Sequence, residues 1–222
     1  MQTIINKIAY GISVLFHPLI VVTYILLVQM LMNPFSFGQS SLKGSSILVL
    51  QVFMLSFVLP AFMVFMMKAV GLIESLDMKD KQERIIPYIG TLIFYLWMYL
   101  SLHKNQHIPV HFTAAVLGSF MALAIIFFIN IFTKISAHAA GLGGLLGSVL
   151  VMMRWFSYST FRFDVAQLHL QVSVVTLLII VLCLAGLVGS ARLQLQAHVP
   201  KDLYAGFAVG FVMQFAAIAL LF

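Results

Sequence analysis

The sequence predicts an all-α membrane protein, a polytopic bundle of about six or seven transmembrane helices. Of its 222 residues, 63% are hydrophobic and only 8% are charged, whereas a soluble domain has about a quarter charged residues. Several apolar runs reach the roughly 20 residues that a helix needs to cross a bilayer. These runs lack the alternation of a membrane strand, so helices are expected to satisfy the backbone within lipid.

Seven apolar runs, separated by short polar stretches, divide the chain into expected spans. In the first run His17 and Pro18 interrupt the pattern, and the proline predicts a kink. We expect a single integral membrane domain over residues 1–222. The expected spans are Ile8–Met32, Ser46–Val70, Ile86–Leu102, Phe112–Thr133, Ala139–Phe156, Leu168–Gly189 and Leu203–Phe222.

The formal net charge of +6 indicates loop charges and contacts with anions. Basic clusters with interleaved aromatic residues are absent from the sequence, so nucleic acid is not an expected partner. The single cysteine, Cys183, lies inside an apolar run and excludes an internal disulfide. The expected partner is therefore the bilayer itself, together with an anionic ligand.

One polar segment, Ser190–Asp202, lies between the last two apolar runs and contains Arg192, His198 and Lys201. Charged groups at membrane depth or at its edge are costly, which makes them candidates for function. This segment is therefore the starting point for locating a site.

Two crossings separate this segment from Ser136–His138, and two more separate Ser136–His138 from Lys79–Pro87. An even number of crossings returns a chain to the same face of the membrane. All three polar stretches are therefore expected on one face. A re-entrant third or fifth span would break this expectation.

Two histidines and a carboxylate on that face suggest acid–base or nucleophilic chemistry. His198 and Asp202 are four residues apart and would share one face of a helical turn. A carboxylate beside one imidazole nitrogen fixes the tautomer and leaves the other nitrogen as a base or nucleophile. The second histidine, His138, could protonate a leaving oxygen.

The same face carries cations that suit phosphate oxygens. Arg192, Lys79 and Arg84 are the expected phosphate-binding side chains, with Lys81 as a further candidate. Ser136 precedes a run of small residues whose helix N-terminus would also favour an anion. Together with the histidines, these residues fit phosphoryl transfer through a histidine.

The spacing of Arg192, His198 and Asp202 resembles the third signature of the phosphatidic acid phosphatase type 2 superfamily, Ser-Arg-x5-His-x3-Asp. This superfamily includes lipid phosphate phosphatases and vanadium-dependent haloperoxidases. In this chain Ala191 separates Ser190 from the arginine, so the serine is displaced by one position.

Two further stretches resemble the other signatures of this superfamily. Ile135–His138 retains the serine and histidine of Pro-Ser-Gly-His but lacks its proline and glycine. Lys79 and Pro87 have the separation of Lys-x6-Arg-Pro, but Ile86 stands at the arginine position. Arg84, two residues earlier, is the expected substitute. The resemblance extends over about residues 79–210.

The resemblance implies a phosphatase that needs neither metal nor cofactor, with a core over about 71–222 preceded by two spans in 1–70. His198 would attack phosphorus and form a phosphohistidine, and Asp202 would orient it. His138 would protonate the leaving group and then help to activate water.

In the same resemblance, Arg192, Lys79 and Arg84 would hold the phosphate oxygens, with Ser136 as a further donor. The substrate would be a lipid carrying a phosphate monoester or diphosphate, reaching the site between helices. The resemblance also implies a bacterial inner membrane with the site on the periplasmic side. The residues themselves leave open which lipid is cut, mono- versus diphosphate preference, the orientation in the membrane and the oligomeric state. They also leave open which of Lys79, Lys81 and Arg84 binds phosphate.

Two functions from other classes remain open at this point. The altered first and second signatures would suit a non-catalytic scaffold homologue that binds lipid or assists assembly. The retention of His138, His198 and Asp202 argues against it. An anion transporter would use the same cations, but no inverted repeat is evident in the sequence.

Two other patterns have alternative interpretations. His103, His107 and His111 recur every four residues, as metal ligands on a helix could, but Pro109 interrupts such a helix. A hydrated loop on the opposite face is the favoured interpretation. Gly143 and Gly147 form a small-xxx-small pattern that predicts close helix packing.

Overall fold

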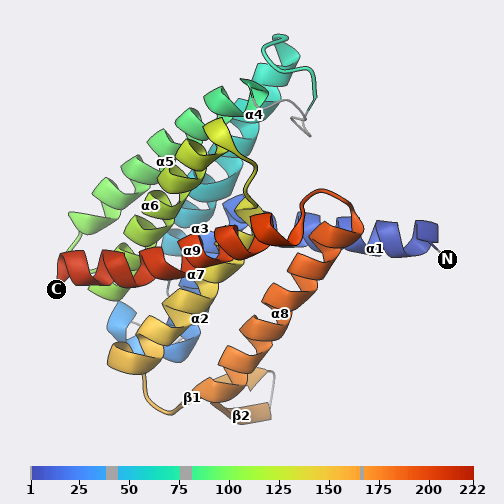
Figure 1. Ribbon diagram of the computed structural model, residues 1–222. Coiled ribbons are helices and arrows are strands. Elements are labelled where there is room, and N and C mark those ends of the chain that lie inside the picture. Colours follow the sequence, from blue (N-terminus) through green and yellow to red (C-terminus); the bar gives the residue numbers. More distant parts are fainter. Residues whose placement is uncertain (1, 39–44, 76–81, 166–167) are drawn as a thin grey trace.

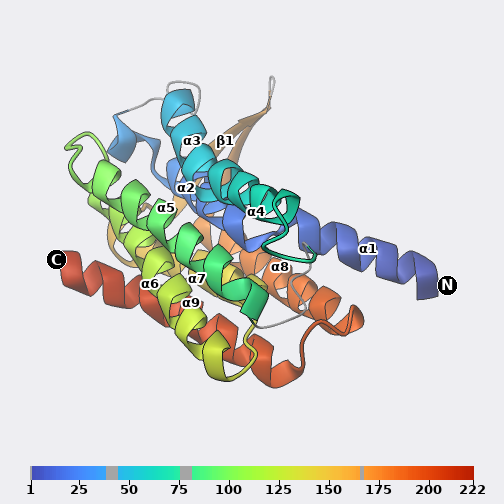
Figure 2. The same cartoon turned by 90° about the horizontal axis from the view of Figure 1, so that it is seen from above.

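The computed structural model describes residues 2–38, 45–75, 82–165 and 168–222. It is a bundle of helices with one short hairpin, which confirms the predicted all-α class (Figures 1 and 2). Seven helical stretches among the described residues are long and apolar enough to cross a membrane. They are Gln2–Met32, Ser46–Ala69, Ile85–His103, Val110–Phe132, Ala137–Phe156, Val174–Gln194 and Pro200–Leu221.

The first stretch is broken where the sequence predicts a kink. Helix α1 (Gln2–Leu15) ends before Pro18, which opens a 3-10 turn at Pro18–Ile20, and α2 (Val21–Met32) follows. Proline cannot donate a backbone hydrogen bond, so the break falls at this point. Helix α1 projects sideways from the bundle, whereas α2 lies within it (Figures 1 and 2).

The next three spans are helices that alternate in direction. Helices α3 (Ser46–Phe53) and α4 (Leu59–Ala69) are continuous through a π turn at Met54–Val58. Helices α5 (Ile85–His103) and α6 (Val110–Phe132) then run side by side along one flank of the bundle (Figures 1 and 2).

Helix α7 (Ala137–Val151), extended by a π turn to Phe156, packs closely along α9 (Pro200–Leu221). A Cβ atom on Gly143 would meet the carbonyl group of Phe207, and one on Gly210 would meet that of Ala140. The predicted packing through small residues is therefore confirmed, and it joins the helix that carries His138 to the one that carries Asp202.

The structure corrects the start of the sixth predicted span. Residues from Leu168 onward form strand β2 (Leu168–Ser173), which pairs antiparallel with β1 (Thr160–Val165), and helix α8 (Val174–Gln194) begins afterwards. The alternation of apolar and polar residues in both segments is typical of strands. Ser173 caps α8 by accepting a hydrogen bond from Val175 N–H at 3.2 Å.

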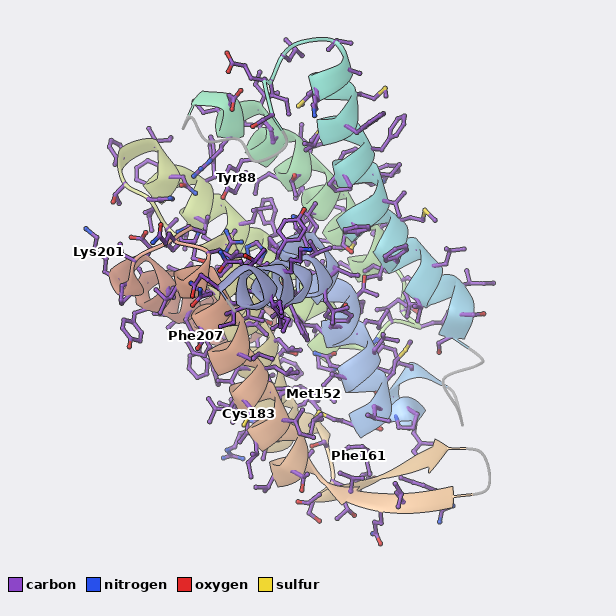
Figure 3. The ribbon with its side chains drawn as sticks, turned by 90° about the vertical axis from the view of Figure 1, so that its right-hand side faces the viewer. Tyr88, Met152, Phe161, Cys183, Lys201 and Phe207 are labelled. Carbon is purple, nitrogen blue, oxygen red and sulfur yellow. The ribbon has the colours of Figure 1, made fainter. Side chains whose placement is uncertain are left out.

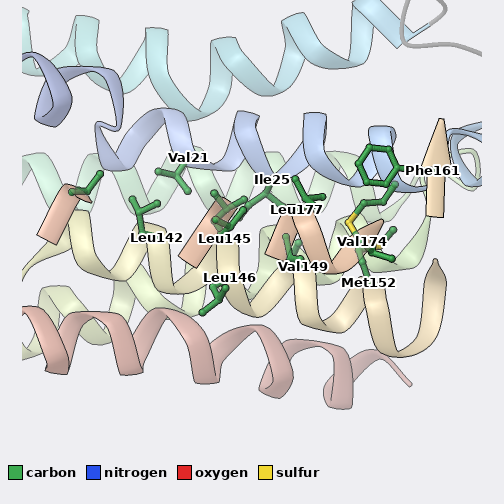
Figure 4. Packing of buried hydrophobic residues seen from close by; sticks show 14 residues of the cluster. Val21, Ile25, Leu142, Leu145, Leu146, Val149, Met152, Phe161, Val174 and Leu177 are labelled. Atoms are coloured by element: carbon green, nitrogen blue, oxygen red, sulfur yellow. The ribbon is translucent and has the colours of Figure 1, made fainter. Parts of the chain in front are cut away.

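Helix α2 lies between two hydrophobic clusters and ties the bundle together. One face contributes Val21 and Ile25 to a cluster with α7, α8 and Phe161 of β1 (Figure 4). Its other face contributes Val22 and Leu26 to a cluster with α3, α5 and α6. The first crossing therefore belongs to the same core as the motif-bearing helices.

Contacts at the two ends fix the relative direction of the helices. At one end, Asn33 Nδ2 donates to the Phe156 carbonyl at 2.7 Å. At the other, Ser136 N–H donates to the Asp202 carbonyl at 3.2 Å. Figure 3 shows Tyr88 and Lys201 toward this second end and Phe161 toward the first.

We call the second end, where α5, α7 and α9 begin and α8 ends, the motif end. The stretches beginning at Ser136 and Arg192 meet there, and the described part of the first stretch, from residue 82 onward, leads into α5. The described motif residues therefore lie toward one end of the bundle, as the number of crossings predicts.

Candidate functional site

A helix stop followed by a helix start places the side chains of the Arg192–Asp202 stretch. Arg192 lies in the last turn of α8, where a cation interacts favourably with the helix C-terminus. Ala197 N–H donates to the Arg192 carbonyl at 3.1 Å, and Gln196 N–H donates to the Leu193 carbonyl at 2.9 Å. With Gln196 at φ 50°, these bonds form a Schellman motif that reverses the chain.

The expected pairing of His198 with Asp202 is present, but a helix cap produces it instead of a shared helical face. His198 precedes the N-cap residue Val199, and Asp202 is the third residue of α9. The Asp202 carboxylate accepts from Val199 N–H at 3.4 Å and lies 3.4 Å from His198 Nδ1. Negative charge in the first turn is also favoured by the helix dipole.

The His198–Asp202 pair is largely shielded from solvent, with side-chain exposures of 9% and 5%. At 3.4 Å this is a close polar contact and not a formed hydrogen bond, because His198 Nδ1 has no hydrogen-bond partner among the described residues. The Asp202 carboxylate is the acceptor that lies beside Nδ1. A proton on Nδ1 of the neutral ring would face this carboxylate, and Nε2 would then keep its lone pair.

The surroundings of His198 favour its neutral form. Burial, reinforced by the positive charges of Arg192 and Lys134, lowers the pKa of its imidazole to about 4, while Asp202 opposes that shift. A neutral imidazole is the form that can act as a nucleophile or base. These surroundings therefore favour a neutral His198 ring near neutral pH.

His138, the second residue of α7, is held by the N-terminal segment. Its Nε2 lies 3.1 Å from the carbonyl oxygen of Ser13 in α1. A carbonyl oxygen only accepts, so Nε2 carries the proton of this bond and Nδ1 is the nitrogen that can exchange one. The bond is local to the motif end, where α1 meets α7.

The two histidines and Arg192 form one cluster. His138 and His198 lie within electrostatic reach of each other, and Arg192 reaches both. These three residues come from α7, from the turn before α9 and from α8. Three separate elements therefore contribute two imidazoles and a guanidinium to one electrostatically connected cluster.

Ser136 is fully buried and caps helix α7. Its Oγ accepts a hydrogen bond from Ala139 N–H at 3.3 Å, and its own N–H donates to the Asp202 carbonyl. The side chain therefore orients the start of the helix that carries His138. The same hydroxyl retains one hydrogen, which is the donor expected for a phosphate oxygen.

Arg84 immediately precedes α5 and lies at the motif end. Its charge acts on Tyr88, one turn further along, and the Tyr88 hydroxyl accepts from Asn130 Nδ2 at 3.0 Å. Tyr88 in turn packs against a cluster containing Ile135, the residue before Ser136. Lys79 and Lys81 lie outside the described residues, so their expected roles stay predictions.

Two residues of this cluster were not expected from the sequence. His17 packs against His138, with ring centroids 5.7 Å apart, and Lys134 acts electrostatically on His198. The position of His17 within an apolar run could have marked it as functional, because ionisable groups at membrane depth are costly. Lys134 is two residues before Ser136, on the face already assigned to the motifs.

The three histidines of residues 103–111 do not come together as metal ligands. His111 is buried at the far end, 2.7 Å from Gln29 Oε1 and 2.9 Å from Ser36 Oγ. His103 instead stacks on Tyr99. Across the described parts of the chain, no three His, Cys, Asp or Glu side chains are grouped as ligands of a metal ion would be.

The chain was compared with models of protein families, with curated proteins and with solved structures. None of the three comparisons finds a match. The chemistry of the cluster therefore rests on its own residues and on the resemblance of their spacing to the superfamily signatures.

Proposed function

We propose that the cluster at the motif end hydrolyses the phosphate monoester or diphosphate of a membrane lipid, through a phosphohistidine on His198. The observation that carries this proposal is the His198–Asp202 pair, with side chains 9% and 5% exposed, within reach of His138 and Arg192. An oriented neutral imidazole, a second imidazole and a guanidinium are the groups that such a transfer needs.

In the first step, the Nε2 lone pair of His198 attacks phosphorus and forms a P–N bond. The P–O bond to the lipid breaks, and His138 Nδ1, which receives a proton from the bound phosphate group, gives that proton to the leaving oxygen. Asp202 stabilises the positive charge that develops on His198. Arg192 and, by resemblance, Arg84 and Lys79 offset the charge on the phosphate oxygens.

In the second step, a water molecule attacks the phosphohistidine while His138 Nδ1 takes one of its protons. The P–N bond breaks, the electron pair returns to His198, and inorganic phosphate leaves. That proton leaves with inorganic phosphate, so the His138 ring of the free protein is again neutral, with its proton on Nε2. Its Nε2 can keep the hydrogen bond to Ser13 throughout, because only Nδ1 exchanges protons in this scheme.

The setting of the cluster supports a lipid substrate. The motif end terminates helices whose outer surfaces are apolar, including Ile86 at 48% and Ile89 at 44% exposure on α5. Acyl chains could remain in the bilayer while the phosphate reaches the cations at the helix ends. The resemblance further suggests the periplasmic face of a bacterial inner membrane.

The test is phosphate release by purified protein in detergent, with a chelator present. The panel contains phosphatidate, phosphatidylglycerol phosphate, polyprenyl phosphates and diphosphates, and lipid A-type substrates. We expect release from at least one of them and its loss in His198→Ala. His107→Ala, which alters an exposed residue at the far end, serves as the matched control and should retain activity.

Two results would contradict the proposal. Full activity in His198→Ala would remove this histidine as the nucleophile. A wild-type protein that folds but releases no phosphate from any member of the panel would favour the non-catalytic lipid-binding alternative, which binding of the same lipids would then test.

A further inference from the structure

His17 lies at the break between α1 and α2, directly before Pro18. It is the N-cap of the 3-10 turn, and its Nδ1 accepts from Leu19 N–H at 3.4 Å. An accepting Nδ1 carries no proton, so this contact defines a neutral ring with its proton on Nε2. The side chain thus has one local role, which is to cap the turn.

A second set of contacts joins His17 to the candidate site. Its ring meets the His138 ring edge-on, with centroids 5.7 Å apart and planes at 78°. On another side it meets the Phe57 ring in the same manner, at 6.3 Å and 76°. The His17 ring is therefore held between the second span and α7, against the imidazole that exchanges protons.

Both contacts to His138 come from the same five-residue segment. The Ser13 carbonyl accepts from His138 Nε2 at 3.1 Å, and the His17 ring packs beside that imidazole. The Ser13 bond selects which nitrogen faces the carbonyl. An imidazole can exchange its two nitrogens by a half-turn about χ2, a torsion that is intrinsically broad and nearly two-fold. A ring packed beside it obstructs that half-turn.

We propose that His17 is a positioning residue for His138. Together with the Ser13 carbonyl, it keeps Nε2 bound to the backbone and leaves Nδ1 as the nitrogen that gives and takes protons. The role in catalysis rests on the proposed function, whereas the orientation of the His138 ring does not. Nothing in the superfamily signatures assigns a residue of the first span to the site.

Two substitutions separate the capping role of His17 from its positioning role. His17→Asn keeps a side-chain acceptor for the Leu19 N–H but removes the ring, since asparagine is a good cap. His17→Phe keeps an aromatic ring beside His138 but removes the acceptor. If the ring positions His138, His17→Asn should keep the stability of the protein but lose the fixed orientation of His138. His17→Phe should keep that orientation but lose stability.

The measurement is the tautomer of His138, read from ¹⁵N shifts of histidine-labelled protein in detergent, with the signal assigned by its loss in His138→Gln. We expect one tautomer, protonated at Nε2, in the wild type and in His17→Phe. His17→Asn should show both tautomers. Its kcat should fall by up to about 10²-fold with KM little changed, while its melting temperature stays near that of the wild type.

A single unchanged tautomer and an unchanged kcat in His17→Asn would overturn the inference. The tautomer is observed without any substrate, so this result is independent of whether the protein is a phosphatase. If the wild type were inactive on every lipid phosphate, the proposed function would fail, yet mixed tautomers in His17→Asn would still support positioning. Should His17→Asn not fold, loss of the single tautomer in His17→Phe would count against the inference.

Discussion

At the level of single residues, the pKa of His198 is set by its burial, by two nearby positive charges and by one nearby negative charge. Burial, Arg192 and Lys134 lower the pKa of its imidazole, and Asp202 raises it. In the proposed mechanism only the neutral ring attacks phosphorus. The pH at which activity disappears therefore reports these neighbours directly.

We expect kcat/KM to be level near neutral pH and to fall as the pH drops through about 4 in the wild type. Below that pKa the ring of His198 is protonated and has no lone pair on Nε2. In Asp202→Asn the acid limb should move to lower pH, because the effect that favours the charged ring is lost. Its plateau should also drop, by about 10²- to 10⁴-fold.

The opposite shift is expected in Lys134→Gln. Lys134 lowers the pKa of His198, so removal of its positive charge should raise that pKa and move the acid limb to higher pH. The pH profiles of the two variants and the wild type, measured with one substrate, check both signs. Shifts in the same direction in both variants would contradict the assignment of His198 as the titrating group.

At the level of elements, the contact between α7 and α9 brings His138 and Asp202 together. The backbones approach so closely that Gly210 and Gly143 leave no room for a side chain. Glycine costs a helix stability relative to alanine, so its presence here is explained by the approach of the two backbones.

We expect Gly210→Ala to separate the two helices, because the added methyl group would meet the Ala140 carbonyl. Overpacking of this kind costs about 1–3 kcal/mol, and activity should fall with it. Gly186→Ala in α8 is the matched control, since its methyl group would meet nothing within 4 Å. Thermal melts and phosphate release should leave that control at or above wild-type stability, and equal losses in both variants would refute the packing argument.

Elements also show where reasoning from the sequence succeeded and where it could not. Hydrophobic runs located each crossing, and Gly143 and Gly147 predicted the close packing of α7. The sixth predicted span began too early, at Leu168, because these residues lead directly into the apolar run of α8; the alternation of apolar and polar residues up to Ser173 is the signal that separates the strand from the helix. Its pairing with Thr160–Val165 is a contact between two strands, and the composition of either segment does not predict it.

At the level of the whole molecule, alternation of the helices gathers the described motifs at one end. Counting crossings was enough to predict this, because it depends only on the number of spans. The number of crossings does not predict how close His138, His198 and Arg192 lie to one another. His17 joins the site through a kink whose direction the sequence leaves undefined, and the His198–Asp202 contact depends on a helix cap.

Sidedness can be measured with a membrane-impermeant thiol reagent in a Cys183→Ser background. Lys134→Cys and Lys201→Cys place thiols at exposed positions of the motif end, and Ser159→Cys places one at the far end. With the site on the periplasmic face, the first two should react in intact cells and the third only after permeabilisation. Labelling of the first two on opposite sides would contradict the common face.

The most direct measurement is the capture of the covalent intermediate. The wild type, mixed with its lipid substrate carrying a labelled phosphate and quenched in alkali, should carry the label on the peptide that contains His198. The adduct should be acid-labile, as a P–N bond is, and it should be absent from His198→Ala. Turnover without any labelled protein, or a label on another residue, would contradict a phosphohistidine at His198.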